Sequence, residues 1–396
     1  GTMVTPVSAT RATVVTPVHV AGAVDVAVTT LPGGTTNIPG GFTYQPLGPT
    51  GLIPWGDDSN GQGDVPRDAE PAIAISAGVK FSVALRNDGT VTAWGLGDTG
   101  QTRVPSGLTD VVSVSAGGDH VLALTGGGSV VAWGANQAGQ ASVPAGLTGV
   151  IAIAAGDQHS LALRSNHTVV AWGGNASGQA SVPAGLSGVV AIAAGSSHSL
   201  ALKSDGTVVA WGQNIYNQTT VPSGLAGVVA ISARGDLNLA LKGDGTVVAW
   251  GQNIYGSADV PPGLVGVVAI SAGYMHALAV KDDGTVVAWG YDIAPAGLTG
   301  VVDVAAGLQH SLALKDDGTI VAWGYNSNGE TVLPVGVTNA VAIAAGEDRS
   351  LLLKSDGTVM AVPAEPYGLG DPPAGLTGVV AISAGRACAS CCASCF

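Results

Sequence analysis

The residues with the most evident chemical potential lie at the C-terminus, where the chain ends in RACASCCASCF. All the cysteines of the 396-residue chain lie in this tail: Cys388, Cys391, Cys392 and Cys395. Tandem Cys-x-x-Cys pairs are typical of metal sites and of thiol–disulfide sites, because thiolates bind soft metals and exchange disulfides. Which chemistry applies depends on the element that carries them, because a metal needs ligands that converge on one point.

A second candidate for chemistry is a set of histidines that recur after an Ala-Gly pair. They are His120, His159, His198, His276 and His310. Their positions are equivalent in successive units of the chain, so their side chains should diverge, and we expect each imidazole to bond a neighbouring backbone group. A serine follows three of them, but adjacent strand residues point to opposite faces, which excludes a nucleophile–base pair. The sequence therefore predicts no catalytic residue, no metal site and no cofactor, and a protein that is not an enzyme.

These residues belong to a tandem repeat that every tryptophan marks, since each is followed by glycine. The tryptophans are Trp55, Trp94, Trp133, Trp172, Trp211, Trp250, Trp289 and Trp323. They lie 39 residues apart six times and then 34 apart, and one more step of 39 reaches Val362 in DGTVMAV. A period of this size predicts a propeller or solenoid, here with nine positions.

One unit, VVAIAAGSSHSLALKSDGTVVAWG, shows how the repeat folds. VVAIAA predicts a first strand and HSLALK, with its alternating polarity, a second. Asp205-Gly206 predicts a hairpin turn, and TVVAW a third strand. We expect a short fourth edge strand before the Val-Pro that follows, which gives four-stranded blades of about 39 residues in an all-β propeller.

The two ends of the array predict how it closes. It starts with a third strand, LIPWG at 52–56, and ends with a first strand, VVAISAG at 379–385. A closing blade built from 52–66 and 379–396 would satisfy both edges and make nine blades, with eight as the alternative. Cys388 then stands in the histidine position of a second strand. Cys388 and Cys392 would share one face, with Cys391 and Cys395 on the other, which favours a latch strand, a disulfide or a cross-link over a metal site.

The motif A-G-x-x-H-S-L-A-L-K-x-D-G-x-V-x-A-W-G, followed by N-x-x-G-Q and V-P, resembles the regulator-of-chromosome-condensation repeat family over about residues 52–388. It is similar to the compact bacterial variant, the secreted β-lactamase-inhibitor propellers, which share the G-Q-x-x-V-P connection and a split closing blade. The resemblance implies a closed propeller that binds proteins. The inhibitors insert aromatic residues that follow Ala-Gly, and Tyr274 is the one aromatic residue at those positions here.

Residues 1–46 do not follow the repeat. Thr16-Pro17, Val24-Asp25-Val26, Phe42 and Tyr44 resemble the C-terminal half of a TIG immunoglobulin-like domain. We expect a partial immunoglobulin-like segment, a remnant or a segment that docks or self-associates, joined by a linker at 47–51 to a propeller at 52–396. The resemblances imply a bacterial protein that is secreted or lies on the cell surface.

Composition limits the partners. The chain has 27 acidic and 14 basic residues and a net charge of −13, which argues against nucleic acid. No apolar run of about 20 residues is present, so we expect no membrane span. Half of the basic residues end second strands beside the Asp-Gly turns, where we expect a salt-bridged rim. They are Arg86, Arg164, Lys203, Lys242, Lys281, Lys315 and Lys354.

The loop after each Trp-Gly varies most between units and carries the candidate binding residues. Tyr216, Tyr255, Tyr291 and Tyr325 lie in consecutive loops, and Tyr274 lies in a turn between strands. Tyrosines on variable loops of a rigid scaffold favour binding. The sequence thus predicts a non-catalytic module that recognises protein or carbohydrate. A subunit of a surface fibre or lattice and an inhibitor of an enzyme such as a β-lactamase are the alternatives.

Overall fold

A computed structural model of the protein describes residues 4–8, 11–14, 22–30, 34–44, 72–77, 81–86, 88–95, 97–327, 330–333, 337–346, 350–355, 359–362 and 383–384. All regular elements within these ranges are β-strands. The chain divides into two units, Gly1–Gly48 with Ser394–Phe396, and Pro49–Ala393. The predicted strand at 52–56, Trp55, the linker at 47–51 and the four cysteines fall outside the described residues.

The first unit contains two separate strand pairs, both antiparallel. β1 (Val4–Ser8) pairs with β2 (Arg11–Val14), and β3 (Gly22–Thr30) pairs with β4 (Gly34–Tyr44). The immunoglobulin-like interpretation of this segment stays a prediction.

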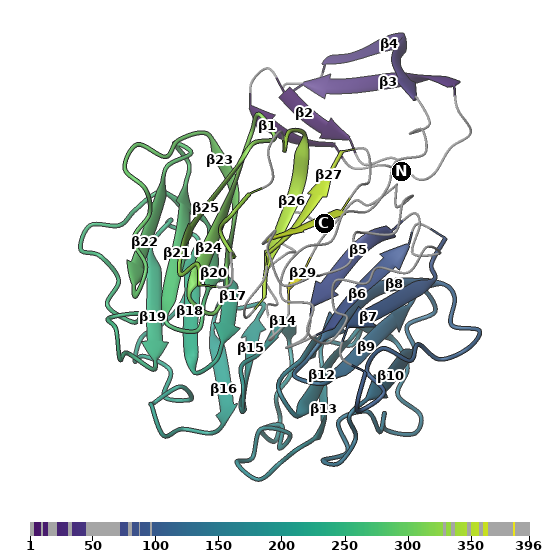
Figure 1. The fold of residues 1–396 in the computed structure, drawn as a ribbon, viewed down its shortest axis with the longest axis vertical. Coiled ribbons are helices and arrows are strands. Elements are labelled where there is room, and N and C mark those ends of the chain that lie inside the picture. The colour runs from purple at the N-terminus through teal and green to yellow at the C-terminus, as the bar shows by residue number, and fades with distance from the viewer. Residues whose placement is uncertain are drawn as a thin grey trace. The chain divides into compact units, whose positions relative to one another are not determined.

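The second unit repeats one motif, a three-stranded antiparallel sheet, eight times in the described residues (Figure 1). We number these sheets one to eight in chain order. The first strands are β5 (Ala72–Ala77), β8 (Val111–Ala116), β11 (Val150–Ala155), β14 (Val189–Ala194), β17 (Val228–Arg234), β20 (Val267–Ala272), β23 (Val301–Ala306) and β26 (Ala340–Ala345). The second strands are β6 (Phe81–Arg86), β9 (His120–Thr125), β12 (His159–Arg164), β15 (His198–Lys203), β18 (Leu237–Lys242), β21 (His276–Lys281), β24 (His310–Lys315) and β27 (Ser350–Lys354). The third strands are β7 (Val91–Gly95), β10 (Val130–Gly134), β13 (Val169–Gly173), β16 (Val208–Gly212), β19 (Val247–Gly251), β22 (Val286–Gly290), β25 (Ile320–Gly324) and β28 (Val359–Val362).

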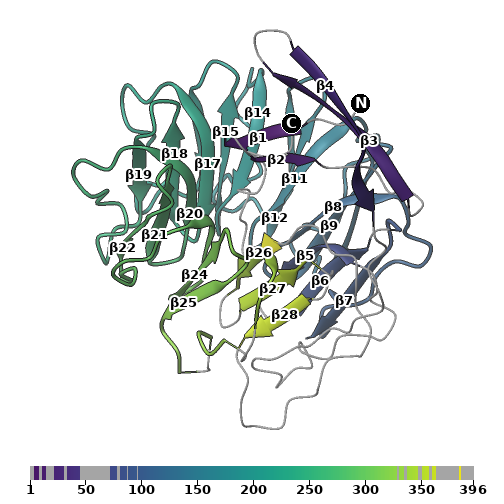
Figure 2. The ribbon, with the colours of Figure 1, turned by 90° about the horizontal axis from the view of Figure 1, so that it is seen from above.

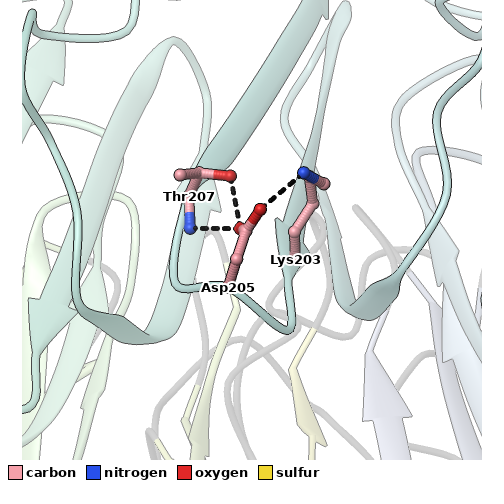
Figure 3. Close-up of polar contacts among 3 residues, drawn as sticks. All are labelled: Lys203, Asp205 and Thr207. Carbon is pink, nitrogen blue, oxygen red and sulfur yellow. Dashed lines mark hydrogen bonds and ion pairs between the residues drawn. The ribbon is translucent and has the colours of Figure 1, made fainter.

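The turn between second and third strands forms as the Asp-Gly pairs predict, and sheet four shows how (Figure 3). Asp205 Oδ1 accepts hydrogen bonds from the backbone N–H of Thr207 at 3.0 Å and from its hydroxyl at 2.6 Å. Gly206 takes φ +77°, and a Cβ there would lie 2.9 Å from the backbone nitrogen of Gly227. Glycine suits this point because it takes a positive φ without cost and leaves room for the next sheet, although sheet three places His167 at the equivalent position with φ +62°.

In the described sheets the predicted fourth edge strand is wrong, because the described residues that follow β7, β10, β13, β16, β19 and β22 form turns instead of a strand. After β16, for example, Asn217, Gly224 and Gly227 all have positive φ, and Pro222 has no N–H to give to a ladder. In this loop the side chain of Asn214 accepts a hydrogen bond from the N–H of Thr219 at 2.9 Å. The loop's polar side chains thus satisfy the backbone that a fourth strand would have used.

The core lies between neighbouring sheets. Between sheets four and five, for example, Leu200 and Leu202 pack with Ile231, Ala240 and Trp250. Alanine at the centre of the strands lets the sheets approach closely, and tryptophan fills the outer part of the gap. The succession of small and large apolar residues in the repeat is therefore a packing pattern between units.

First strands also contact one another in succession, from β5 through β8, β11, β14, β17, β20 and β23 to β26. One more strand, β29 (Ser383–Ala384), pairs in parallel with β5, at Ser383 with Ser76 and at Ala384 with Ala77. β29 also contacts β26, and Figure 2 shows β26 and β27 beside β5 and β6. The described residues thus form an all-β fold of repeated three-stranded sheets, consistent with a β-propeller.

Candidate functional site

Each sheet of the second unit has two ends with different chemistry. Its loop end carries the turn between the first and second strands and the start of the loop after the third strand. Backbone hydrogen bonds connect this loop to this turn. The N–H of Tyr291 donates to the carbonyl of Met275 at 3.0 Å, and that of Gln213 to Ser197 at 2.9 Å. Its turn end carries the Asp-Gly turns. Because strands alternate in direction, all five candidate tyrosines lie at the loop end.

Four consecutive loops, after β16, β19, β22 and β25, expose large apolar side chains at the loop end. Their exposed fractions are Ile215 69%, Tyr216 39%, Ile254 64%, Tyr255 48%, Tyr291 44%, Ile293 80% and Tyr325 42%. We call these seven residues the tyrosine row. The rings of Tyr255 and Tyr291 meet edge to face, with centroids 5.3 Å apart. The three isoleucines were missed by the sequence analysis, although two of them precede tyrosine in the repeated Asn-Ile-Tyr.

Tyr274 lies at the same end but in a different setting. It is half-buried, and its ring lies against Gly235, where a Cβ would come 2.8 Å from the ring. Its N–H donates to the carbonyl of Gly307 in the next sheet at 3.2 Å. Tyr274 therefore packs turns of neighbouring sheets together.

The loops of the tyrosine row are held by their own polar side chains. Asn214 and Asn253 each accept a hydrogen bond from the N–H five residues ahead, at 2.9 Å. The Gln218 side chain accepts the N–H of Tyr216 at 2.8 Å and donates to Asp236 at 2.9 Å. The polar residues of these loops thus position the backbone, and the isoleucines and tyrosines are left to face solvent.

The recurrent histidines join neighbouring sheets. His120 and His159 place Nε2 2.9 and 3.0 Å from the hydroxyl of Ser160 and Ser199, each in the following sheet. Each serine donates its own proton to a loop carbonyl, so the histidine donates from Nε2. The prediction that each imidazole bonds a neighbouring backbone group is wrong for His120 and His159, because the partner is a serine side chain of the next repeat.

His198 follows the same rule with another partner, since Asn238 replaces serine and accepts through Oδ1 at 2.7 Å. All these imidazoles are fully buried, and burial lowers the pKa of His120 to about 4 and that of His159 and His276 to about 3. Burial also lowers the pKa of His198. They are neutral at physiological pH. Among the described residues, no group of three histidines, cysteines or acids is arranged to hold a metal.

The tryptophans converge on the same loop carbonyls as the serines. The carbonyl of Gln179, for example, accepts from Ser199 at 2.9 Å and from Trp211 Nε1 at 2.9 Å. Trp133, Trp172, Trp250 and Trp289 donate in the same way, and Trp94 is equally buried. The repeat markers thus form a junction of histidine, serine, carbonyl and tryptophan between sheets.

Sheet seven departs from this junction because the loop before it is five residues shorter. Asp292 takes the place of the carbonyl and accepts the Ser311 hydroxyl at 2.6 Å, while His276 Nε2 lies 2.9 Å from that hydroxyl. Trp323 Nε1 has no partner among the described residues. Asp, Ser and His meet here, but the serine stands between the other two and is fully buried. A catalytic triad needs the acid on the histidine and an accessible serine.

Arg234 was missed by the sequence analysis, although it stands where the other units have glycine after Ala. It is 2% exposed, and its guanidinium donates to the carbonyls of Ala306 and Ala345 at 2.7 and 2.8 Å. These carbonyls end the first strands of sheets seven and eight. Arg234 therefore connects sheet five to two sheets that do not follow it directly.

The turn end carries ion pairs, as the basic residues beside the Asp-Gly turns predict. Lys203 lies 2.7 Å from Asp205, and Lys242, Lys281 and Lys315 make the same pair at 2.8, 2.9 and 3.4 Å. The lysine and the threonine of the turn hold the pKa of Asp205 well below its usual range. Exposed pairs of this kind add little stability, so the rim is a solvated surface.

The sequence carries a known repeat. Six segments match the family described as Regulator of chromosome condensation (RCC1) repeat, at residues 72–101, 111–140, 150–179, 189–218, 267–292 and 301–330. No curated protein sequence matches the chain. In the described part of the chain, no helix has the length and apolar character to cross a membrane.

Solved structures show the same fold at low identity. Prp20p of Saccharomyces cerevisiae is 22% identical, with a TM-score of 0.52 over 78% of this chain and 93% of its own. Human WBSCR16 is 21% identical, with a TM-score of 0.51 over 77% and 100%. The ectodomain of receptor kinase CR4 from Physcomitrella patens is 24% identical, with a TM-score of 0.50 over 64% and 73%. The chain therefore contains RCC1 repeats and shares the fold of RCC1-type propellers.

Proposed function

We propose that this chain is a non-catalytic recognition module that binds a protein through the tyrosine row. The observation that carries the proposal is the exposed Tyr255–Tyr291 pair, flanked by Ile254 and Ile293, on loops that are already held in place. Aromatic anchors dominate binding energy at protein interfaces, and loops fixed before binding lose little entropy.

The chemistry of the row favours a protein over a carbohydrate. Sugar hydroxyls need polar side chains that are free to bond. Here Asn214, Asn253 and Gln218 are used within their own loops. What faces solvent is apolar and aromatic, as at the centre of protein interfaces. One solved propeller of this type, yeast Prp20p, is described as binding Gsp1p and histones, and a second structure of it shows it bound to Kap60.

A catalytic role has no support at the sites that could carry one. The histidine–serine pairs are fully buried, and each serine gives its proton to a neighbouring acceptor. A secreted or cell-surface bacterial location is part of the proposal and rests on the resemblances of the repeat and of residues 1–46.

We also propose that the array closes as a nine-bladed propeller, with β29 as the first strand of the ninth blade. The contacts of β29 with both β26 and β5 support this arrangement, since they continue the succession of first strands.

Affinity capture with the purified full chain tests the binding proposal. A variant with Tyr216, Tyr255, Tyr291 and Tyr325 replaced by alanine should lose its partner, with affinity falling at least about 100-fold, because each anchor contributes about 1–2 kcal/mol. The control replaces Lys203, Lys242, Lys281 and Lys315 at the turn end by alanine and should capture the same protein. Equal capture by the tyrosine variant, or binding to a glycan array in place of protein, would contradict the proposal.

A further inference from the structure

The contact between Tyr255 and Tyr291 brings together two phenols from neighbouring sheets, five and six. Their ring centroids lie 5.3 Å apart and their planes meet at 74°, so the edge of one ring faces the other. Both side chains are also open to solvent, Tyr255 by 48% and Tyr291 by 44%. Two exposed phenols in contact are able to react with each other.

The pair is specific to these two sheets, although four consecutive loops carry a tyrosine. Tyr216 and Tyr255 each follow the tryptophan of their own repeat by five residues, whereas Tyr291 follows its tryptophan by two. Tyr291 thus occupies a different point of its loop, one that lies against Tyr255. In the described part of the chain, Tyr216 and Tyr325 make no ring contact.

Hydrogen bonds hold the backbone that carries each ring of the pair. Asn253 Oδ1 accepts the N–H of Ala258 at 2.9 Å, and Asn253 Nδ2 donates to Asp259 at 2.8 Å. The N–H of Tyr291 donates to the carbonyl of Met275 at 3.0 Å. Reactive groups that a fold holds in contact react far faster than the same groups meeting by collision. The pair is therefore positioned to react within one chain.

Other oxidisable side chains of the described sheets are less suited to coupling. The tryptophans from Trp94 to Trp323 are only 5–8% exposed, and Met275 is half-buried. Tyr216 and Tyr325 are 39% and 42% exposed, but neither lies against a second ring in the described residues. An oxidant at the loop end therefore meets one exposed place where two phenols are already in contact.

We propose that Tyr255 and Tyr291 are an oxidative cross-linking site, at which a peroxide-driven one-electron oxidant joins the two rings into dityrosine. Each phenol gives one electron to the oxidant and one proton to water and becomes a tyrosyl radical. The two radicals couple through a new carbon–carbon bond between positions ortho to the oxygens, and the two hydrogens on these carbons then move to the oxygens. Overall the pair loses two hydrogen atoms, and one hydrogen peroxide is reduced to two waters.

The cross-link connects the loops after β19 and β22 covalently, so it fixes sheets five and six to each other at their loop end. The proposal goes beyond the binding function and does not rest on it, because the product is detected without a partner. A chain that binds no protein through the tyrosine row would still form the cross-link.

Oxidation of the purified full chain by a haem peroxidase with hydrogen peroxide tests the site. The cysteines are alkylated first, because thiols reduce tyrosyl radicals, and the chain is kept dilute so that collisions between chains are rare. The monomer recovered by size exclusion should fluoresce as dityrosine and lose the mass of two hydrogen atoms. Trypsin cuts after Lys281, between the two tyrosines, so the digest should contain two peptides joined through Tyr255 and Tyr291.

Four phenylalanine variants, each with the thermal transition of the unmodified chain, assign the cross-link. Tyr255→Phe and Tyr291→Phe each keep the ring but remove one phenol, and should lower the yield of dityrosine in the monomer at least about tenfold. The matched controls, Tyr216→Phe and Tyr325→Phe, should leave the yield unchanged. Free tyrosine in a parallel reaction shows that the oxidant is active. A monomer without dityrosine under that condition, a yield that neither Tyr255→Phe nor Tyr291→Phe lowers, or a cross-link between other tyrosines would overturn the proposal.

Discussion

At the scale of single residues, the buried histidines are the groups whose protonation most affects the stability of the fold. His120, His159, His198 and His276 each bond through Nε2 to a side chain of the next sheet, and burial lowers the pKa of all four. Leu237 occupies the same position in sheet five and is also fully buried, which shows that the position serves packing. The free energy of unfolding should therefore depend on pH through the protonation of these imidazoles.

Stability should fall as the pH drops from about 6.5 towards 4. The unfolded chain protonates its histidines near pH 6.5, whereas burial lowers the pKa of His120 to about 4 and of His159 to about 3 in the fold. Below pH 6.5 the unfolded state thus binds more protons, and each histidine costs about 1.4 kcal/mol per pH unit. Above that pH the histidines have no effect. Burial raises the pKa of Asp303 to about 6, which opposes the trend by one proton.

The urea midpoint as a function of pH measures this effect. The matched control, His159→Leu, introduces the residue that the equivalent position holds at Leu237. Its free energy of unfolding should depend less steeply on pH, by about 1.4 kcal/mol per unit. A midpoint that stays level between pH 6.5 and 4 would show that the histidines are not buried as neutral groups.

At the scale of elements, the repeat predicts the three strands and the hairpin turn, because hydrophobic period and Asp-Gly act locally. The prediction of a fourth strand was wrong because Asn and Gln side chains accept hydrogen bonds from the N–H groups of the loop. Composition alone does not reveal these bonds. The predicted backbone partner was also wrong for His120 and His159, since both bond side chains of the following repeat, Ser160 and Ser199. Contacts between units do not follow from the pattern within one unit.

A side chain in a turn can cost stability in two ways, through a positive φ and through a clash with the next sheet. Two glycines with the same backbone conformation distinguish these two costs. Gly206 and Gly224 have φ of +77° and +78°, but only at Gly206 would a Cβ meet the next sheet, 2.9 Å from Gly227 N. Gly224→Ala should cost about 1 kcal/mol for the left-handed conformation alone. Gly206→Ala should cost at least twice as much in urea denaturation. Equal losses would mean that the sheets do not approach so closely.

At the scale of the whole molecule, the eight described sheets depend on how their two ends are satisfied. β29 pairs with the edge of β5 and also contacts β26, so it links the first of the described sheets to the last. The sequence predicts a closing blade built from 52–66 and 379–396. β29 lies within the second of these segments but pairs with β5, so the closing blade stays a prediction. The other parts of the predicted closing blade, and the cysteines, lie outside the described residues.

Breaking the β29 pairing should loosen the ends of the array. Ser383→Pro removes the backbone N–H of the residue that pairs with Ser76 and fixes its φ. Ser383→Thr keeps the N–H and the strand conformation and is the control. In the proline variant, amide exchange should accelerate in β5 and β26 and stay unchanged in β14, which lies three sheets from β5. Uniform exchange in all three strands would contradict a closing role for β29.

Arg234 has a consequence for how such a chain assembles. Nearly identical repeats can stack out of order, since any sheet fits beside any other, and this is a common failure of repeat proteins. Arg234 distinguishes sheet five from its neighbours, because its buried guanidinium is satisfied by the carbonyls of Ala306 and Ala345 in sheets seven and eight. Ala306 and Ala345 end equivalent strands, so Arg234 links sheet five to sheets seven and eight through backbone that every unit provides. An arrangement in which no such carbonyls lie within its reach would leave a buried charge without acceptors.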